Sequence, residues 1–286
     1  MSSNLLRKRT APDASGCIQK ITPANAGWEY VGFEVYLLEP GMTLTQETGS
    51  FEACLVLVAG RASVKTADAS YDNIGQRMSP FERTKPYSVY VPPKNSFTVK
   101  AETALELAVC KAPAKGKFPS RLIGPDAVNT AQRGKGHNQR YVQNIIDENA
   151  DAEGLLVVEC YTDEGNTSSY PSHKHDTDNP PHETDLVETY YHRFDPPQGW
   201  GMQRVYNDDR SLDVCVAPYD KDVVLAPKGY HPVATLAGYD NYYLNVMAGP
   251  LHLWKVNWEK DHAWINTDAY PRKKNTGGGC GCGCCD

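Results

Sequence analysis

Short apolar runs, each closed by glycine or proline, constrain the fold of this chain more than any other feature. Residues 51–60 read FEACLVLVAG, and residues 87–91 read YSVYV before Pro92 and Pro93. Runs of this length, rich in β-branched and aromatic residues, predict strands, and glycine and proline mark the turns between them. We therefore expect an all-β chain of sandwiches or barrels with few short helices.

The β pattern occurs twice, with an interruption between the two parts. Further strands are expected at 96–101, 104–110, 154–161, 201–206, 212–216, 222–226 and 241–247. A length of 286 residues fits two domains on a prior of ~150 residues each. We expect an N-terminal arm at 1–20, a first β domain at 21–112, a Pro/Gly/Lys-rich linker at 113–150, a second β domain at 151–268 and a tail at 269–286.

Composition narrows the class of protein. The formal net charge is -6, and 40% of the residues are hydrophobic. This balance argues against nucleic acid or an anionic membrane as the main partner, because both favour basic surfaces. The N-terminus lacks the apolar core of a secretion signal, and no run approaches the ~20 apolar residues of a membrane span. We expect a cytoplasmic protein, and the sheet edges of both halves would allow a homodimer.

Cysteines form two groups. Five are scattered singly among apolar neighbours, which is typical of reduced thiols. Four others, Cys280, Cys282, Cys284 and Cys285, crowd into a glycine-rich tail. Such a tail is expected to be a disordered appendage, with binding of a soft metal ion as the alternative.

Histidines are confined to one half of the chain: all eight lie from His137 onward. His173 and His175 are two residues apart, so in an extended chain both side chains point to the same side. His231, on a Pro/Gly turn, supplies a third imidazole. With one carboxylate these three would hold a divalent ion and leave positions open for substrate. The order His-x-His, a later Glu opening a strand, and Pro-x-Gly-x-His is the double signature of the cupin barrel.

Several stretches extend this signature to a particular family. They lie at 168–171, 173–176, 188–193, 203–206, 227–232 and 238–249. These resemble the 5-deoxy-glucuronate isomerases of myo-inositol catabolism, relatives of the 5-keto-4-deoxyuronate isomerases, from about Trp28 to about Trp264. The resemblance implies a bicupin with one divalent metal (Zn, Mn or Fe) in its second cupin. It also implies interconversion of the aldose 5-deoxy-D-glucuronate and the ketose 2-deoxy-5-keto-D-gluconate.

The resemblance implies His173, His175, Glu188 and His231 as metal ligands. Twelve residues separate His175 from Glu188, more than in a generic cupin. Glu188 is favoured because it opens a strand-like run, whereas the preceding Asn-Pro-Pro segment indicates an inserted loop. Four acids in that loop compete with it: Asp176, Asp178, Glu183 and Asp185.

Residues for proton transfer and substrate binding follow from strand alternation. Tyr190 and His192 share a face with Glu188, and Tyr243 shares a face with Asn245 on a later strand. Tyr190, His192 and Tyr243 are the catalytic candidates, although tyrosines in such runs are also typical of a core. Substrate-binding candidates are Asn245, Lys174 and Arg204. A guanidinium pairs bidentately with a carboxylate, but Arg204 would serve equally as a structural ion-pair partner.

Two other functions use the same scaffold. Cupin Fe(II) dioxygenases can carry the same three-His, one-Glu set, and some cupins bind sugars without catalysis. The fold alone does not choose among these functions.

Overall fold

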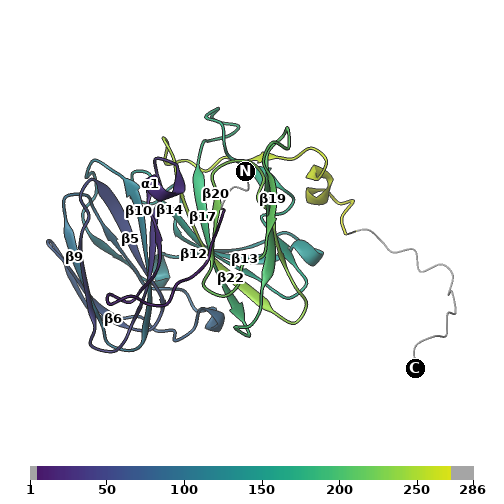
Figure 1. Cartoon of the computed structure of the whole chain (residues 1–286). Coiled ribbons are helices and arrows are strands. Elements are labelled where there is room, and N and C mark those ends of the chain that lie inside the picture. The colour runs from purple at the N-terminus through teal and green to yellow at the C-terminus, as the bar shows by residue number, and fades with distance from the viewer. Residues whose placement is uncertain (1–4, 272–286) are drawn as a thin grey trace, which may run out of the picture.

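The computed structural model describes residues 5–271 and contains two β-sandwiches side by side (Figure 1). The helices are short: α1 (Pro23–Ala26), η1 (Pro80–Glu82), η2 (Pro125–Ala127), η3 (Gly136–Asn138) and η4 (Ala263–Asn266). Among the residues described, no helix has the length and apolarity needed to cross a membrane. The four clustered cysteines of the tail lie outside the described residues.

The first sandwich consists of a six-stranded sheet and a four-stranded sheet, with antiparallel neighbours throughout. Their orders are β11-β8-β5-β10-β3-β2 and β4-β9-β6-β7. The bounds are β2 Cys17–Ile21, β3 Gly32–Leu38, β4 Thr43–Glu47, β5 Phe51–Ala59, β6 Ala62–Thr66, β7 Ser70–Ile74, β8 Ser88–Val91, β9 Ser96–Ala101, β10 Leu105–Pro113 and β11 Arg121–Ile123.

The second sandwich repeats this plan with a seven-stranded and a four-stranded sheet. Their orders are β1-β20-β17-β22-β14-β13-β12 and β15-β21-β18-β19, and β16 pairs separately with β23. The bounds are β1 Leu6–Arg7, β12 Asn129–Arg133, β13 Arg140–Ile146, β14 Leu156–Thr162, β15 Thr167–Ser168, β16 His173–Lys174, β17 Val187–Asp195, β18 Gly201–Tyr206, β19 Asp213–Val216, β20 Val223–Ala226, β21 Val233–Thr235, β22 Asp240–Ala248 and β23 Asn257–Trp258.

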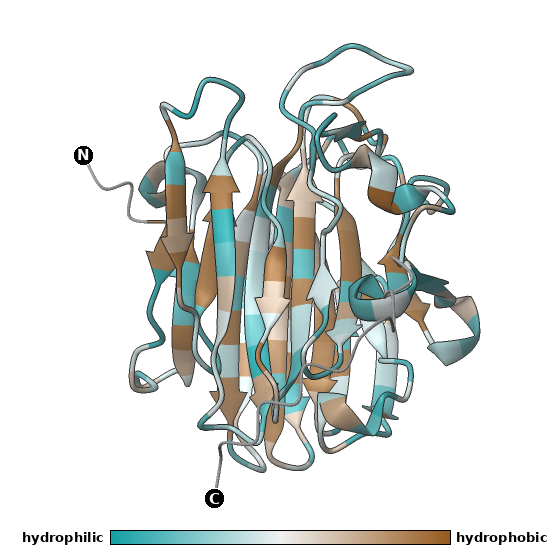
Figure 2. Ribbon diagram, turned by 90° about the vertical axis from the view of Figure 1, so that its right-hand side faces the viewer, coloured by the Kyte–Doolittle hydropathy of each residue, from teal (hydrophilic) through white to brown (hydrophobic). Residues whose placement is uncertain are grey.

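Hydrophobic and hydrophilic residues follow one another along several of these strands, as the brown and teal bands of Figure 2 show. In the first sandwich the inner face is almost entirely apolar and forms a core of its own. In the second, strand β17 turns Glu188, Tyr190 and His192 to one side, and all three are buried. A buried polar face needs partners inside the sandwich, so the second interior is the place for chemistry.

The two large sheets pack against each other through their outer faces. One apolar cluster includes residues of both sheets, and the rings of Phe33 and Tyr191 lie 5.9 Å apart between centroids. Buried charges also join the sandwiches: Arg77 pairs with Glu159, and Arg193 pairs with Glu106. Apolar packing and buried ion pairs thus hold the two sandwiches together.

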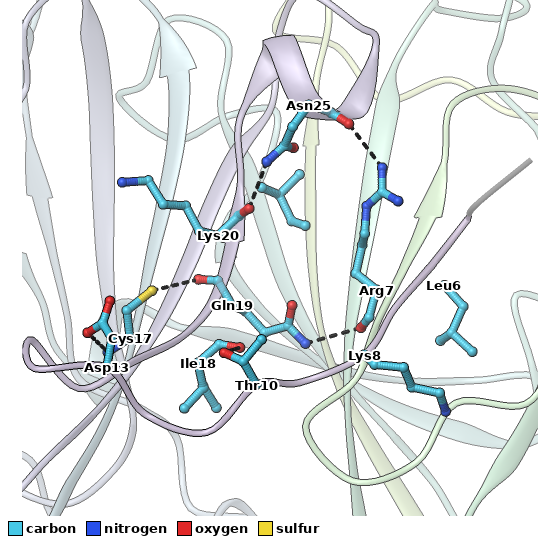
Figure 3. A pocket seen from close by; sticks show the side chains of 11 residues that line it. Leu6, Arg7, Lys8, Thr10, Asp13, Cys17, Ile18, Gln19, Lys20 and Asn25 are labelled. Atoms are coloured by element: carbon cyan, nitrogen blue, oxygen red, sulfur yellow. Dashed lines mark hydrogen bonds between the residues drawn. The ribbon is translucent and has the colours of Figure 1, made fainter.

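The N-terminal arm crosses between the sandwiches. Strand β1 pairs with β20 of the second sandwich, and β2 pairs with β3 of the first. The Gln19 amide donates to the carbonyls of Arg7 and Lys221 at 3.1 and 2.9 Å, and residues of the arm line an open cavity of 710 Å³ (Figure 3). None of the candidate site residues lines this cavity.

Much of the stretch 113–150, expected to be a linker, belongs to the two sandwiches. Strand β11 belongs to the first large sheet, and β12 and β13 form a hairpin at the edge of the second. Gly134, Lys135 and Gly136 lie in the turn of that hairpin rather than in a connection between domains. Edge strands carry charged and polar residues, which hid β12 from the hydrophobic pattern.

Candidate metal centre and active site

Three buried imidazoles converge inside the second sandwich. His173 lies on β16, His175 directly follows that strand, and His231 lies between β20 and β21. One ring nitrogen from each lies within 4.8 Å of the other two. The spacing of two residues along an extended chain thus brings His173 and His175 to the same side, as expected, and the Pro/Gly turn brings His231 to them.

Glu188 adds a carboxylate to this cluster. Its Oε2 lies 3.2 Å from Nε2 of His175 and 3.1 Å from Nε2 of His231, and the side chain is 2% exposed. Two competing acids serve the loop instead: Asp176 accepts the backbone N–H of Gly229, and Glu183 accepts the backbone N–H of Asp176. The geometry therefore favours Glu188 as the fourth ligand.

Backbone carbonyls orient two of the rings. Nδ1 of His175 lies 3.0 Å from the carbonyl of Leu186, and Nδ1 of His231 lies 2.8 Å from that of Gly229. An N–H at each Nδ1 leaves the lone pair of Nε2 free, which is the arrangement common to metal-binding histidines.

Buried polar atoms without hydrogen-bond partners provide a test of metal binding. Among the described residues these include Nδ1 of His173, Nε2 of His175 and of His231, and Oε2 of Glu188. Unpaired buried polar atoms are rare in proteins because each loses its hydration. A divalent cation would satisfy this set, so the residues fit a metal ion.

The charge states of His173 and Glu188 suit a cation, whereas the hydrogen bond and the charge of Glu188 outweigh burial and raise the pKa of His175. Burial, followed by the neighbouring His231 and His175, lowers the pKa of His173 well below its usual value. Burial raises the pKa of Glu188, but His231 and His175 outweigh it, so the pKa is lowered. A neutral imidazole and an ionised carboxylate are the forms that bind metal.

Two neighbouring cavities give access to the cluster. The inner cavity, 40 Å³, is lined by His173 and Glu188, and the outer one, 580 Å³, shares His173 with it. Trp254 lines both cavities, and Trp258 lines the outer one and packs edge-on against His173 at 5.1 Å between centroids. A ligand in the outer cavity would thus reach the imidazoles past aromatic walls.

Tyr190 and Tyr243 line the inner cavity. Their ring centroids are 4.9 Å apart, and the hydroxyl of Tyr190 lies 3.2 Å from that of Ser169. Burial raises the pKa of both phenols well above the usual value, and the charge of Glu188 raises that of Tyr190 further. Both therefore stay protonated at neutral pH and can donate hydrogen bonds.

Asn245 lines a cavity, whereas His192 does not. Asn245 lines the inner cavity, and its amide donates to the carbonyl of Thr189 at 3.3 Å. His192 lines neither cavity; its ring nitrogens lie 3.1 and 3.3 Å from the amide oxygens of Gln203 and Asn241. His192 is thus a buried neighbour of Tyr190 and has no access to a ligand in either cavity.

Arg204 and Lys174 do not line the two cavities. Arg204 lies on the exposed side of β18, where its guanidinium makes two 2.7 Å hydrogen bonds to Asp213 and covers the ring of Tyr206. Lys174 pairs with Asp208 and Asp176 on the side of β16 opposite to His173. Assigning Arg204 to the substrate carboxylate is therefore wrong for this cavity, because period two puts it outside the sandwich.

A comparison with models of protein families identifies the family of this chain. The model of the KduI/IolB family matches residues 5–265. The chain belongs to the KduI/IolB family. The predicted resemblance to 5-deoxy-glucuronate isomerases is thereby confirmed.

Curated relatives of this family cover most of the chain. A protein of Geobacillus thermodenitrificans is 53% identical over 255 residues, 89% of this chain and 93% of its own. One of Geobacillus kaustophilus is 52% identical over 263 residues, 92% and 95% of the two chains. Both are named 5-deoxy-glucuronate isomerase.

Solved structures support the fold. An IolB-like protein of Salmonella typhimurium matches with a TM-score of 0.90 and 61% identity, covering 92% of this chain and 100% of its own. Oxalate decarboxylase of Bacillus subtilis matches with a TM-score of 0.63 at 13% identity, covering 90% and 80%. The second likeness concerns the fold alone, and together they confirm the expected all-β bicupin.

Several residues of this KduI/IolB site were given no role in the sequence analysis. Arg133, Arg140, Cys160, Ser169 and Trp254 line the inner cavity. The arginines lay in the expected linker, and Cys160 had the pattern of an inert buried thiol. The run around Arg140 contains the β-branched residues Val142, Ile145 and Ile146 close behind it, and this signal could have placed Arg140 in a sheet.

Proposed function

We propose that this chain is a 5-deoxy-glucuronate isomerase, an enzyme that interconverts 5-deoxy-D-glucuronate and 2-deoxy-5-keto-D-gluconate. The observation that carries the proposal is the buried cluster of His173, His175, His231 and Glu188 within a chain whose closely similar relatives bear that name. A small-molecule uronate is therefore the proposed substrate.

The four side chains would hold one divalent ion. Such an ion acts as a Lewis acid that polarises a carbonyl oxygen and stabilises negative charge on it. Zinc, manganese and iron all accept imidazole and carboxylate ligands, so we propose one of these three.

The reaction is a balanced proton shift. A proton leaves C2 of the aldose and a proton is returned to C1, while the electron pair of the C2–H bond forms the C1–C2 double bond of an enediolate. The C2 hydroxyl also gives up its proton, and the former aldehyde oxygen on C1 gains one. The carbonyl thereby moves from C1 to C2, and no external oxidant or reductant is consumed. Negative charge develops on oxygen in the process, so groups that donate hydrogen bonds to oxygen accelerate it.

Protonated phenols in the inner cavity suit that requirement. Tyr190 and Tyr243 both keep their protons, and both line the cavity beside Glu188. We assign them the role of donating hydrogen bonds to the substrate oxygens. His192 would support the ring of Tyr190, with centroids 6.2 Å apart, rather than contact substrate.

The dioxygenase and sugar-binding alternatives are not favoured, because the relatives that span most of the chain are named as isomerases. An anaerobic assay separates the three. We expect the purified protein, after metal analysis, to convert 5-deoxy-glucuronate to the ketose without oxygen, as followed by NMR in deuterated water. Absence of any isomerised product from metal-loaded protein would overturn the proposal.

A further inference from the structure

Two arginines face each other at the cavity of the metal cluster. Arg133 on β12 and Arg140 on β13 are direct cross-strand partners in the antiparallel hairpin. Like charges placed directly opposite each other destabilise a sheet. Both line the inner and the outer cavity. The hairpin thus concentrates two positive charges at the entrance to the metal cluster.

Neither arginine has a carboxylate partner within residues 5–271. One guanidinium nitrogen of Arg140 donates to the carbonyls of Asn138 and Tyr170 at 3.0 and 3.1 Å, and these are its hydrogen bonds in the described chain. The guanidinium of Arg133 lies over the ring of Trp254 at 5.1 Å. By contrast, Arg77, Arg193 and Arg204 each pair with an acid.

Trp254 adds an unused donor to the pair. Its indole Nε1 is buried and has no hydrogen-bond partner among the described residues, and its side chain lines both cavities. A buried N–H without an acceptor loses its hydration without compensation. A ligand oxygen in the cavity would supply that acceptor.

Other charges around the cavities fit an anion at this place. The outer cavity also contains Asp147, which accepts the backbone N–H of Asn149 at 2.9 Å, and Glu148, which is paired with Lys255 at 2.9 Å. In the inner cavity, Glu188 is the single carboxylate among the lining residues, and it belongs to the metal cluster. Partial desolvation and then the charge of Arg140 lower the pKa of Arg133, which accords with two uncompensated cations.

We infer that Arg133 and Arg140, together with the indole N–H of Trp254, form the subsite that binds the carboxylate of the sugar acid. The inference rests on the proposed function for the identity of the substrate, whose carboxylate and aldehyde lie at opposite ends of one carbon chain. With the carboxylate held at the arginines, the aldehyde end extends toward the imidazoles. Planar guanidiniums can bind a carboxylate with two hydrogen bonds each.

The test compares Arg133→Gln, Arg133→Lys and Arg140→Gln with the parent protein, all loaded with metal. Substitution of Arg133 is less prone to disturb folding than substitution of Arg140. The Arg133 side chain is exposed and makes no hydrogen bonds in the described structure, whereas Arg140 is buried. We expect KM for 5-deoxy-glucuronate to rise about 10- to 100-fold in Arg133→Gln, with kcat changed much less. The KM of Arg133→Lys should lie between those of the parent and Arg133→Gln, because lysine keeps the positive charge but lacks the planar guanidinium.

A binding measurement separates this inference from the proposed activity. Calorimetry with D-glucuronate and with D-glucose compares an acid with a neutral sugar, and it needs no turnover. We expect the parent protein to bind the acid more tightly and Arg133→Gln to lose that preference. If the parent shows the preference but no isomerisation, the subsite stands and the proposed function fails.

Lys135→Gln is the matched control, since Lys135 lies in the same hairpin but lines neither cavity. It should leave KM and the preference for the acid within about twofold of the parent. Unchanged KM and unchanged glucuronate binding in both folded, metal-loaded glutamine variants would overturn the inference. Equal loss of glucuronate and glucose binding would also overturn it, because that result indicates a general distortion of the cavity.

Discussion

The two sandwiches share one strand order but differ in the side chains of their interiors. The order β8-β5-β10-β3-β2 of the first large sheet corresponds to β20-β17-β22-β14-β13 of the second. In each, a proline directly follows the first strand of this order: Pro92 follows β8, and Pro227 follows β20. Ala53 pairs with Val91 as Glu188 pairs with Ala226. Glu188 therefore has Ala53 as its counterpart.

The interior positions differ in kind. By the same register, Tyr190 corresponds to Leu55 and Asn245 to Val109, and both apolar residues are fully buried. The first interior is closed by packing, whereas the second keeps polar atoms without partners and two cavities beside them. The comparison teaches that the backbone supplies the frame, and that a few inward positions decide whether a sandwich binds metal.

The first sandwich does carry one inward charge cluster. Lys111, the partner of Ala53, lies 3.2 Å from Glu34, and the amide of Gln46 donates to the same carboxylate at 2.9 Å. This ion pair satisfies its own charges. The carboxylate of the second sandwich has instead two imidazoles beside it.

Removing a metal ligand should give the largest effect. His231→Ala deletes one imidazole, so we expect loss of bound metal and a fall in kcat/KM of about a thousandfold or more, as the Lewis acid contributes several kcal/mol. Metal content and NMR turnover measure this. His182→Ala, an exposed histidine of the inserted loop, is the control and should keep both. Full activity in His231→Ala would contradict the assignment of the second sandwich as the metal domain.

A cavity-forming substitution in the core of the first sandwich should lower stability and leave metal binding unchanged. Leu55 is fully buried, so Leu55→Ala should lower the free energy of unfolding by about 2 to 5 kcal/mol, measured by urea denaturation. The folded protein should keep its metal. Leu251→Ala, 39% exposed, should change stability by less than about 0.5 kcal/mol. Loss of metal from folded Leu55→Ala would show that the first interior takes part in the site.

The ion pair of the first sandwich predicts a pH effect. Burial raises the pKa of Glu34, but Lys111, Gln46 and Tyr36 outweigh it and hold the pKa below its ordinary value. The unfolded chain therefore binds this proton first, and stability is lost as pH falls below about 4.3 and through the folded pKa.

Glu34→Gln tests this sign. We expect a loss of about 1 to 2 kcal/mol at pH 7 and a shallower decline of Tm between pH 5 and pH 3, recorded by thermal unfolding. Glu47→Gln, an exposed acid on the neighbouring β4, is the control. If Tm declines between pH 5 and pH 3 as steeply in Glu34→Gln as in the parent, the ion pair of Glu34 and Lys111 does not contribute to the pH dependence of stability.

Removing the exposed arginine of the second sandwich should have the smallest effect. Arg204→Gln breaks an exposed pair with Asp213, which is worth at most about 1 kcal/mol of stability. We expect KM for 5-deoxy-glucuronate to stay within about twofold of the parent. A tenfold rise in KM, measured in the same assay, would restore Arg204 to the substrate site.

The sequence predicted what depends on local pattern. Alternation and Pro/Gly turns predicted the all-β fold, and the His-x-His spacing with the Pro-x-Gly-x-His turn predicted the imidazole cluster that the structure contains. Glu188 was chosen over the acids of the preceding loop because it begins a run with the pattern of a strand. These signals are local because each is set by backbone geometry within a few residues.

Long-range pairing was beyond the sequence pattern. The edge hairpin that presents Arg133 and Arg140 is polar, so its hydrophobic pattern is weak. Arg204 was misplaced because the face of a strand depends on register, and a shift of one residue exchanges inside for outside. Trp254 joins the cavity from a segment without strand structure, and only the folded chain brings it there.

The central claim is that one sandwich binds a divalent metal and the other does not. Anomalous diffraction from crystals of the metal-loaded protein tests it most directly, since it locates the ion among the side chains. We predict one strong peak among His173, His175, Glu188 and His231, and no peak inside the first sandwich. An active protein with no peak at those four side chains, or with a peak in the first sandwich, would contradict the account.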